Sequence, residues 1–323
     1  MAWTSNQQRA KHMKIYLSSF TIEALTEYCK IFPDEKLNIL LSFAFRSNKY
    51  LEFMTTYKDK ISSLILDSGA FTLNSSTNKK LLDGITFEAY KGYLNLFSDN
   101  FDYYFNYDAN FDKDGLFDNL YYQVNLQNKG HKPVPVVHNY QDSELELYLN
   151  EPRWSHDIIA LGYAEDKWEG DNIERLALRI HEAKKKVHVL GVASYRKLVN
   201  TPIQYSDSSS WVQYGKYGQI RFWNENKNPE KIKNINDPDM TDTINFKDGY
   251  TKVKAKEKFS DDYYYTTYYG KKYLEEYLGN VFGWEWHELL PPKNIKRMLV
   301  NIHYFVQLQK RITERHIAQK FLV

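Results

Sequence analysis

The sequence is poor in cysteine, in long apolar stretches and in net charge. A single Cys among 323 residues excludes an internal disulfide framework and any zinc site built from several thiolates. No run approaches the ~20 apolar residues of a membrane span, and no signal-peptide core follows the basic opening segment. A formal net charge of +2 is too small to indicate a nucleic-acid binder by itself. These absences predict a cytoplasmic protein without a membrane segment, in which a metal site would need His and carboxylate ligands.

Aromatic residues are abundant, at 16% of the chain with 27 Tyr. An aromatic core explains this excess, and so does stacking on bases or sugars. For the tyrosine cluster at 263–269 we favour packing on the fold over base stacking. Charge is divided along the chain: from Gly215 onward 19 Lys and Arg stand against 14 Asp and Glu, whereas the rest is slightly acidic.

Short apolar runs alternate with longer segments, some of which have apolar residues at helical spacing. This alternation indicates parallel strands joined by helical crossovers, and eight such units predict a (β/α)8 barrel, the TIM-barrel architecture. Amphipathic helices are predicted over 87–97, 116–126 and 172–184. The predicted strands are 14–18, 38–43, 63–66, 102–107, 134–137, 157–161, 187–192 and 203–205.

The composition changes after Trp211. Residues 212–262 are rich in Asn, Lys, Asp and Gly, which predicts loops or a small irregular insertion. Two helices are predicted further on, around 271–278 and 294–310. We therefore divide the chain into a barrel core, 1–211, and an α-rich extension without zinc ligands, 212–323.

Three carboxylates follow predicted strands, where the active site of such a barrel lies. Asp67 ends the third strand, Asp108 follows the fourth and Asp207 follows the eighth. An Asp in this position is often only a cap for the next helix. Three together favour chemistry at a glycosidic carbon, where one carboxylate attacks and another moves protons. Divalent-metal binding by the same aspartates is the competing interpretation, and His188, placed at the start of its strand, is interpreted as structural.

These motifs, in this order, resemble the tRNA-guanine transglycosylase family and its DNA-modifying relatives of the DpdA type. The resemblance spans about 14–211 and implies a barrel that acts as a pentosyltransferase without a cofactor. The motifs are LDSGAF (66–71), FNYDAN (105–110), VVH (136–138), IALGYAE (159–165), HVLGVAS (188–194) and YSDSSSW (205–211).

The resemblance implies a role for each matching residue. Asp207 would be the nucleophile at C1′ of the target nucleoside, Asp67 would assist with protons, and Asp108 would accept hydrogen bonds from the purine. His138 stands where the family usually has Gln. The remaining base contacts would come from Phe71 and Leu190, which would sandwich the ring, and from the backbone of Leu161 and Gly162.

The chain also departs from the family pattern. Members that act on tRNA usually have a zinc site of three Cys and one His after the last strand, and that region has no Cys here. DNA, with a free 7-deazaguanine base as second substrate, is therefore the preferred substrate pair. A zinc-free tRNA enzyme, a non-catalytic nucleic-acid-binding subunit and a hydrolase that leaves an abasic site are the alternatives, and a protein partner or homodimer stays open. Either phosphate contact or a solvated helix face explains the basic residues Lys293, Lys296, Arg297, Lys310 and Arg311.

Overall fold

The computed structural model describes residues 12–19, 21–112, 114–138, 140, 142–162, 172–225, 227, 238–246, 271–291 and 294–322. The chain forms two compact units. The first draws on Met1–Phe20, Lys36–Ser208 and Ile312–Val323, and the second on Thr21–Glu35 and Ser209–Arg311. The tyrosine cluster at 263–269 and Lys293 lie outside the described residues.

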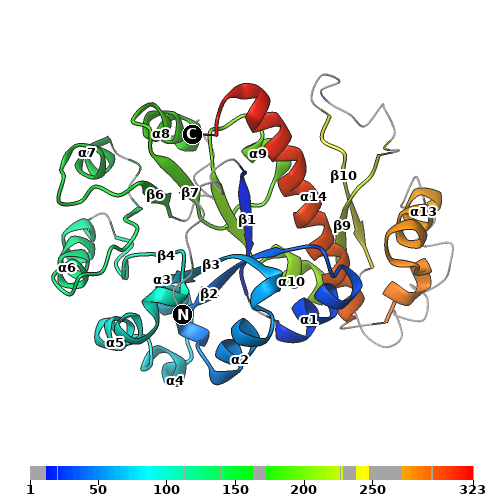
Figure 1. Ribbon diagram of the computed structural model, residues 1–323, viewed down its shortest axis with the longest axis horizontal. Coiled ribbons are helices and arrows are strands. Elements are labelled where there is room, and N and C mark those ends of the chain that lie inside the picture. The colour runs from blue at the N-terminus through cyan, green and yellow to red at the C-terminus, as the bar shows by residue number, and fades with distance from the viewer. Residues whose placement is uncertain are drawn as a thin grey trace. The chain divides into compact units, whose positions relative to one another are not determined.

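The first unit is an α/β structure built on one eight-stranded parallel sheet. Its strand order is β4-β3-β2-β1-β8-β7-β6-β5, and Figure 1 shows α5, α6, α7 and α8 following one another around the outside of the strands. The strands are β1 (Lys14–Leu17), β2 (Leu37–Ser42), β3 (Ile61–Asp67), β4 (Tyr103–Tyr104), β5 (Val136–Val137), β6 (Ile158–Leu161), β7 (Lys186–Val189) and β8 (Tyr205–Ser208). The α-helices of this unit are α2 (Asn48–Thr56), α3 (Ala70–Ser75), α4 (Lys79–Leu82), α5 (Phe87–Phe97), α6 (Leu116–Gln127), α7 (Asp142–Asn150), α8 (Asn172–Glu182) and α9 (Tyr195–Leu198). Single 3₁₀ turns lie at Phe43–Phe45, Lys58–Lys60 and Ser98–Asn100.

All eight predicted strands are present, with one shift that matters for the site. The last strand begins at Tyr205 and runs to Ser208, whereas the apolar pattern predicted 203–205. Asp207 therefore lies within β8 and pairs in register with Tyr16 of β1. The apolar run predicts a strand that ends before Asp207, because the inner face of β8 changes from the aromatic Tyr205 to the charged Asp207 within the strand.

The two end strands of the sheet, β4 and β5, are linked by backbone contacts just beyond them. Phe105 and Val134 form a parallel bridge. The Asn106 N–H donates to the Val134 carbonyl at 2.9 Å, and the Val134 N–H donates to the Tyr104 carbonyl at 2.8 Å. The sheet is therefore curled, so that its first and last strands in the pairing order approach each other.

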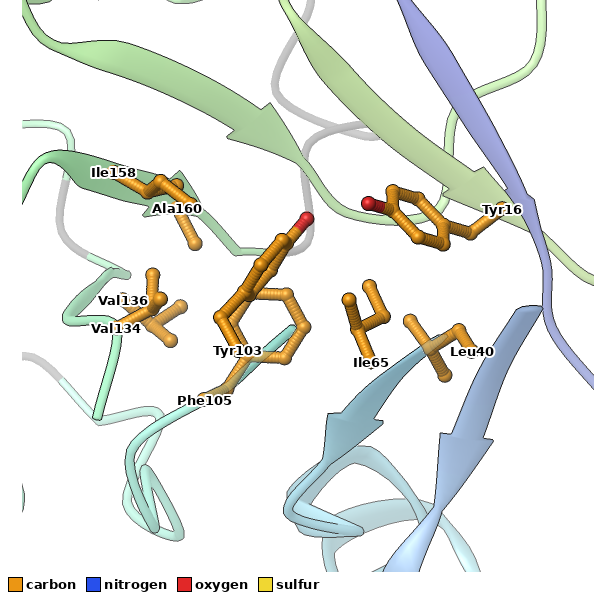
Figure 2. Close-up of a cluster of buried hydrophobic side chains, with 9 residues drawn as sticks. All are labelled: Tyr16, Leu40, Ile65, Tyr103, Phe105, Val134, Val136, Ile158 and Ala160. Atoms are coloured by element: carbon orange, nitrogen blue, oxygen red, sulfur yellow. The ribbon is translucent and has the colours of Figure 1, made fainter. Parts of the chain in front are cut away.

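The inner face of the curled sheet is filled by side chains from its strands. Successive side chains of a strand point to opposite faces, so every second residue faces inward. Figure 2 shows these residues pointing toward one another from the strands around them. The buried cluster consists of Tyr16, Leu40, Ile65, Tyr103, Phe105, Val134, Val136, Ile158 and Ala160, with Leu190 and Tyr205 packed against it.

The second unit has its own core around an antiparallel strand pair. Its elements are α1 (Ile22–Ile31), α10 (Ser210–Lys216), β9 (Gln219–Trp223), β10 (Thr241–Asn245), α13 (Lys271–Phe282), a 3₁₀ turn at Trp286–Leu289 and α14 (Ile295–Gln319), whose last residues belong to the first unit. Phe222, Phe246 and Val300 are among its fully or almost fully buried residues. The expectation of loops or a small irregular insertion over 212–262 missed the strand pair β9 and β10. In β9 the alternate apolar residues Ile220 and Phe222 are buried. Across the residues that the structure describes, no helix is long and apolar enough to cross a membrane.

Candidate active site

The three predicted aspartates lie at one edge of the curled sheet. Asp67 ends β3, Asp207 lies in β8, and Asp108 follows β4. Ile65 and Tyr205 belong to the inner apolar layer, so alternation directs Asp67 and Asp207, two residues further along, to the same inner side. The charges of Asp108 and Asp207 both raise the pKa of Asp67. The other two aspartates are therefore close enough to Asp67 for their charges to affect its ionisation.

Asp67 is held by the loop that follows it. Gly69 adopts a left-handed conformation with φ of 85°, which suits glycine, and its N–H donates to Asp67 Oδ2 at 2.9 Å. The Ser42 hydroxyl of β2 donates to the same oxygen at 3.0 Å. Desolvation, followed by the charge of Asp108, raises the pKa of Asp67 to about 7 against the lowering effect of these two hydrogen bonds. Asp67 is thus suited to give and take a proton near neutral pH.

Asp108 and His138 form a buried pair. Asp108 is 5% exposed and His138 is 7% exposed, and His138 Nε2 lies 2.7 Å from Asp108 Oδ2. The Ser68 hydroxyl donates to Asp108 Oδ1 at 2.8 Å. The ring of Phe111 lies 4.5 Å from the imidazole, between ring centroids. His138, where the family usually has Gln, is therefore fixed by the carboxylate that the resemblance assigns to base recognition.

Gly162 leaves room for the His138 ring. A Cβ at position 162 would lie 2.8 Å from Cε1 and Nδ1 of His138 and 3.0 Å from Val136. The Gly162 carbonyl accepts a hydrogen bond of 2.6 Å from the Tyr140 hydroxyl. Because Gly162 directly follows β6 and has no side chain, the imidazole can pack against the backbone.

We expect Gly162→Ala to lower the stability of the fold by roughly 1–3 kcal/mol, because the added methyl group overlaps the His138 ring. Denaturant unfolding gives the free energy of unfolding of each variant. Gly92→Ala is the matched control, since position 92 lies within α5 and a Cβ there meets nothing within 4 Å. The control should be stabilising by up to about 1 kcal/mol because alanine is the better helix former. Equal stability of the two variants would contradict the packing described for Gly162.

The Asp207 carboxylate contacts the His188 ring of β7. One carboxylate oxygen, Oδ1, lies 3.2 Å from His188 Nε2 and accepts the Gly191 N–H at 3.2 Å. His188 is fully buried, and its Nδ1 lies 2.8 Å from the Tyr103 hydroxyl. Gly191 has φ of 79°, again in the region that favours glycine. Asp207 is 7% exposed, so the nucleophile that the resemblance implies is both buried and fixed in orientation.

The interpretation of His188 as merely structural missed this contact. The strand β7 is only four residues long, and His188 is its third residue. His188 therefore lies near the carboxyl end of the strand and not at its start. His188 pairs in register with Tyr205 of β8, which puts its ring next to Asp207 two residues further on. Inward alternation in the HVLGV motif was the signal that could have identified this histidine.

The other base-binding candidates lie at the same ends of the strands. Phe71 is 57% exposed on α3, and Leu190, which follows β7, packs on the inner apolar cluster. The Leu161 side chain is fully buried, its carbonyl accepts the Leu190 N–H at 3.1 Å, and the Gly162 N–H donates to Val137 at 2.9 Å. These backbone groups thus already have partners in the sheet, and the sandwich of a base between Phe71 and Leu190 stays a prediction.

Metal binding was the competing interpretation of the aspartates. In the described ranges, no three His, Cys, Asp or Glu side chains gather closely enough to ligate a metal ion. The Ser68 hydroxyl and the Phe111 ring also contact the Asp108 and His138 pair, and the His138 backbone N–H donates to Glu144 Oε1 at 3.2 Å. The lone Cys29 is buried on α1, as its helical surroundings predict.

The basic residues predicted to contact phosphate already have partners in the second unit. Lys310 Nζ lies 2.6 Å from Glu35, Arg311 lies 2.5 Å from Glu225, and Lys296 pairs with Glu288. Arg297 is fully buried; its guanidinium donates to the carbonyls of Leu289 at 2.6 Å and Leu290 at 2.8 Å. The expectation that Arg297 contacts nucleic acid or forms part of a solvated face is therefore wrong, because its position on α14 faces the core of the unit.

We expect Arg297→Ala to destabilise the second unit by roughly 3 kcal/mol. The substitution leaves a cavity and removes the donors to the buried Leu289 carbonyl and the partly buried Leu290 carbonyl. Lys310→Ala, which breaks an exposed ion pair on the same helix, should cost less than about 1 kcal/mol. Urea unfolding of both variants measures the difference, and an Arg297→Ala protein as stable as Lys310→Ala would contradict the buried role.

Comparison of the chain with protein-family models, curated proteins and solved structures finds no match.

Proposed function

We propose that this protein is a base-exchanging nucleic-acid glycosyltransferase that replaces guanine in DNA with a free 7-deazaguanine. The observation that supports this most is a pair of dissimilar carboxyl groups at one sheet edge. Asp207 is buried and oriented by two hydrogen bonds to a single oxygen, whereas Asp67 has a pKa raised to about 7. A nucleophilic carboxylate and a carboxyl group that exchanges protons at neutral pH are what double displacement at a sugar carbon needs.

We also propose that the curled sheet is a closed (β/α)8 barrel. The strand order and the backbone bridge between Phe105 and Val134 support closure. Side chains from at least six strands meet in one buried cluster, as in the packed interior of such barrels. An active site at the carboxyl ends of the strands then follows from the architecture.

The proposed reaction has two displacements at C1′ of the nucleoside. Asp207 attacks C1′ through an oxygen, the bond from C1′ to the base nitrogen breaks, and guanine leaves with the electron pair and a proton from Asp67. The 7-deazaguanine then loses its ring N–H proton to Asp67 and attacks C1′, and the ester to Asp207 breaks. Each displacement inverts C1′, so the β-linkage is retained.

Base recognition is proposed for Asp108 together with His138. Each Asp108 oxygen accepts one hydrogen bond and has capacity for a second from the purine N–H groups. The target base must first be unstacked and turned out of the helix, which costs a few kcal/mol. Stacking on exposed Phe71 would offset part of this cost.

Exchange of labelled guanine into duplex DNA, single-stranded DNA and tRNA, run side by side, tests the proposal. We expect label in DNA and its displacement by an added 7-deazaguanine. Incorporation into tRNA alone would overturn the choice of substrate. Loss of guanine without incorporation would instead identify a hydrolase, and no reaction with any of the three would contradict the proposed activity.

A further inference from the structure

Two exposed side chains, Phe45 and Arg46, follow β2 at the carboxyl end of the sheet. The 3₁₀ turn Phe43–Phe45 comes directly after β2. Its first two residues are buried, whereas Phe45 is 49% exposed, and Arg46 is exposed as well. A single exposed Phe is common on protein surfaces. This one lies beside a cation, at the same ends of the strands as the three aspartates of the candidate active site.

The turn that carries Phe45 packs against the loop that holds Asp67. Ser42, the last residue of β2, pairs in register with Asp67, and its hydroxyl donates to the Asp67 carboxyl group. A Cβ at Gly69 would lie 3.1 Å from both the Cβ and the backbone N of Ala44, the residue before Phe45. Neighbouring strands are about 4.8 Å apart. A nucleotide adjacent to one held at Asp67 is therefore within reach of this turn.

The Arg46 guanidinium is held in one orientation and keeps unused donors. Its Cζ lies 3.9 Å from the centroid of the buried Phe43 ring. One terminal nitrogen donates to the Phe43 carbonyl and the other to the Gly84 carbonyl, both at 3.0 Å. Partial desolvation lowers the pKa of Arg46, but arginine stays charged in proteins and has five N–H donors. A fixed planar cation with donors to spare suits a phosphate group.

The segments around this turn carry an excess of positive charge. In 43–50 and 68–86, which follow β2 and β3, four Lys and Arg side chains stand against one Asp. Among the residues that the structure describes, none of these four cations has a carboxylate partner, unlike Lys310 of the second unit. A polynucleotide strand, with its regular negative charges, complements such a surface. The four cations are Arg46, Lys49, Lys79 and Lys80.

We propose that Phe45 and Arg46 bind single-stranded DNA next to the target nucleotide. Phe45 stacks on the neighbouring base, and Arg46 binds a phosphate of the same strand. The inference deepens the proposed function and rests on it for the target nucleotide. A base that is turned out of the helix leaves its neighbour without one stacking partner. An exposed aromatic ring replaces that partner whatever the neighbouring base is, because every base has a π-face.

Binding of a short fluorescein-labelled oligothymidylate to the full chain tests the role of Phe45. The probe contains no guanine, so its affinity is measured whether or not base exchange occurs. We expect Phe45→Ala to weaken binding about 5- to 150-fold, the usual effect of removing one stacking partner, and Phe45→Trp to bind like wild type. Leu96→Ala is the matched control. Leu96 is 75% exposed near the end of α5 that leads to the start of β4, so the control should also bind like wild type.

Three outcomes of this experiment would overturn the inference. The first is a wild-type protein that does not bind the probe, and the second is equal affinity of Phe45→Ala and Leu96→Ala. The third is a loss of affinity confined to oligouridylate, which would identify RNA as the occupant. If the expected binding pattern is found but guanine is not exchanged, the proposed function fails and the binding surface stands.

The salt dependence of the same binding tests the role of Arg46. Each phosphate contact contributes about 0.7 to the magnitude of the slope of log affinity against log salt concentration for a single strand. The Arg46→Gln side chain is uncharged but can still donate to a loop carbonyl, so we expect the magnitude of the slope to fall by about 0.7. Lys129→Ala, at an exposed position after α6, is the matched control and should keep the wild-type slope. An unchanged slope in Arg46→Gln would show that Arg46 only joins two loops, and would overturn the phosphate contact.

Discussion

Replacing Asp207 by Asn should abolish a covalent adduct between the protein and its polynucleotide. The wild-type protein, incubated with DNA and denatured without added base, should retain a fraction of the DNA in a denaturation-resistant complex. The amide lacks the carboxylate charge that attacks C1′, so we expect base exchange to fall by roughly 10⁴-fold or more. Gel analysis of the adduct and single-turnover exchange of labelled guanine measure the two effects.

The variant should fold normally, because an amide oxygen at this position still accepts the N–H of Gly191 and the contact from His188. Asp83→Asn, at an exposed position, is the matched control for loss of one carboxylate, and it should keep full activity and the adduct. An Asp207→Asn protein with full activity would exclude the proposed mechanism.

Replacing Asp67 by Asn should slow base exchange by about 10²- to 10⁴-fold, the usual contribution of a group that transfers protons in the transition state. Covalent attack by Asp207 remains possible, so a weak adduct should persist. In the wild-type protein, release of guanine should slow as the pH rises through about 7, where Asp67 loses its proton. Single-turnover rates between pH 5 and pH 9 measure this decrease in rate, which should be missing in Asp67→Asn.

The same substitution should change the pH dependence of stability. The pKa of Asp67 is raised from 3.8 to about 7 in the folded protein, so the folded state binds the proton more tightly than the unfolded chain. The resulting stability is complete below the unfolded pKa and is lost as the pH rises through the folded one. At pH 9 Asp67→Asn should therefore be more stable than wild type, by up to about 4 kcal/mol for a shift of this size.

Urea unfolding of both proteins at pH 4 and pH 9 tests this expectation. In the Asp67→Asn variant the amide oxygen can accept the same hydrogen bonds from Ser42 and Gly69, so the two proteins should differ little at pH 4. If the unfolding free energies of the two proteins differ by the same amount at pH 4 and at pH 9, burial does not raise the pKa of Asp67.

The eight strands of the sheet could be predicted because each has a short apolar run bounded by polar residues. The same signal failed at the eighth strand, where Asp207 and Ser208 belong to the strand. It also failed at β9 and β10, since the surrounding Asn and Lys residues resemble a loop by composition. Pairing with a neighbouring strand decided both cases, as it does for β9 with β10.

The aspartates of the site could be predicted because each follows or ends an apolar run, where the carboxyl end of a strand is expected. Their partners could not be predicted in the same way. The contact of His138 with Asp108 joins residues 30 positions apart, and that of His188 with Asp207 joins residues 19 apart. Such pairs depend on strand register and on loop conformation, which local patterns do not determine.

The sequence alone thus determined the alternation of strands and helices, the three carboxylates and the absence of a multi-cysteine zinc site. Tertiary structure decided the state of those groups: it set the raised pKa of Asp67, buried Arg297 away from solvent and placed His188 beneath Asp207. The physical reason is that apolar periodicity is a local property of the chain. Desolvation and hydrogen-bond partnership, by contrast, arise only when distant segments exclude water from one another.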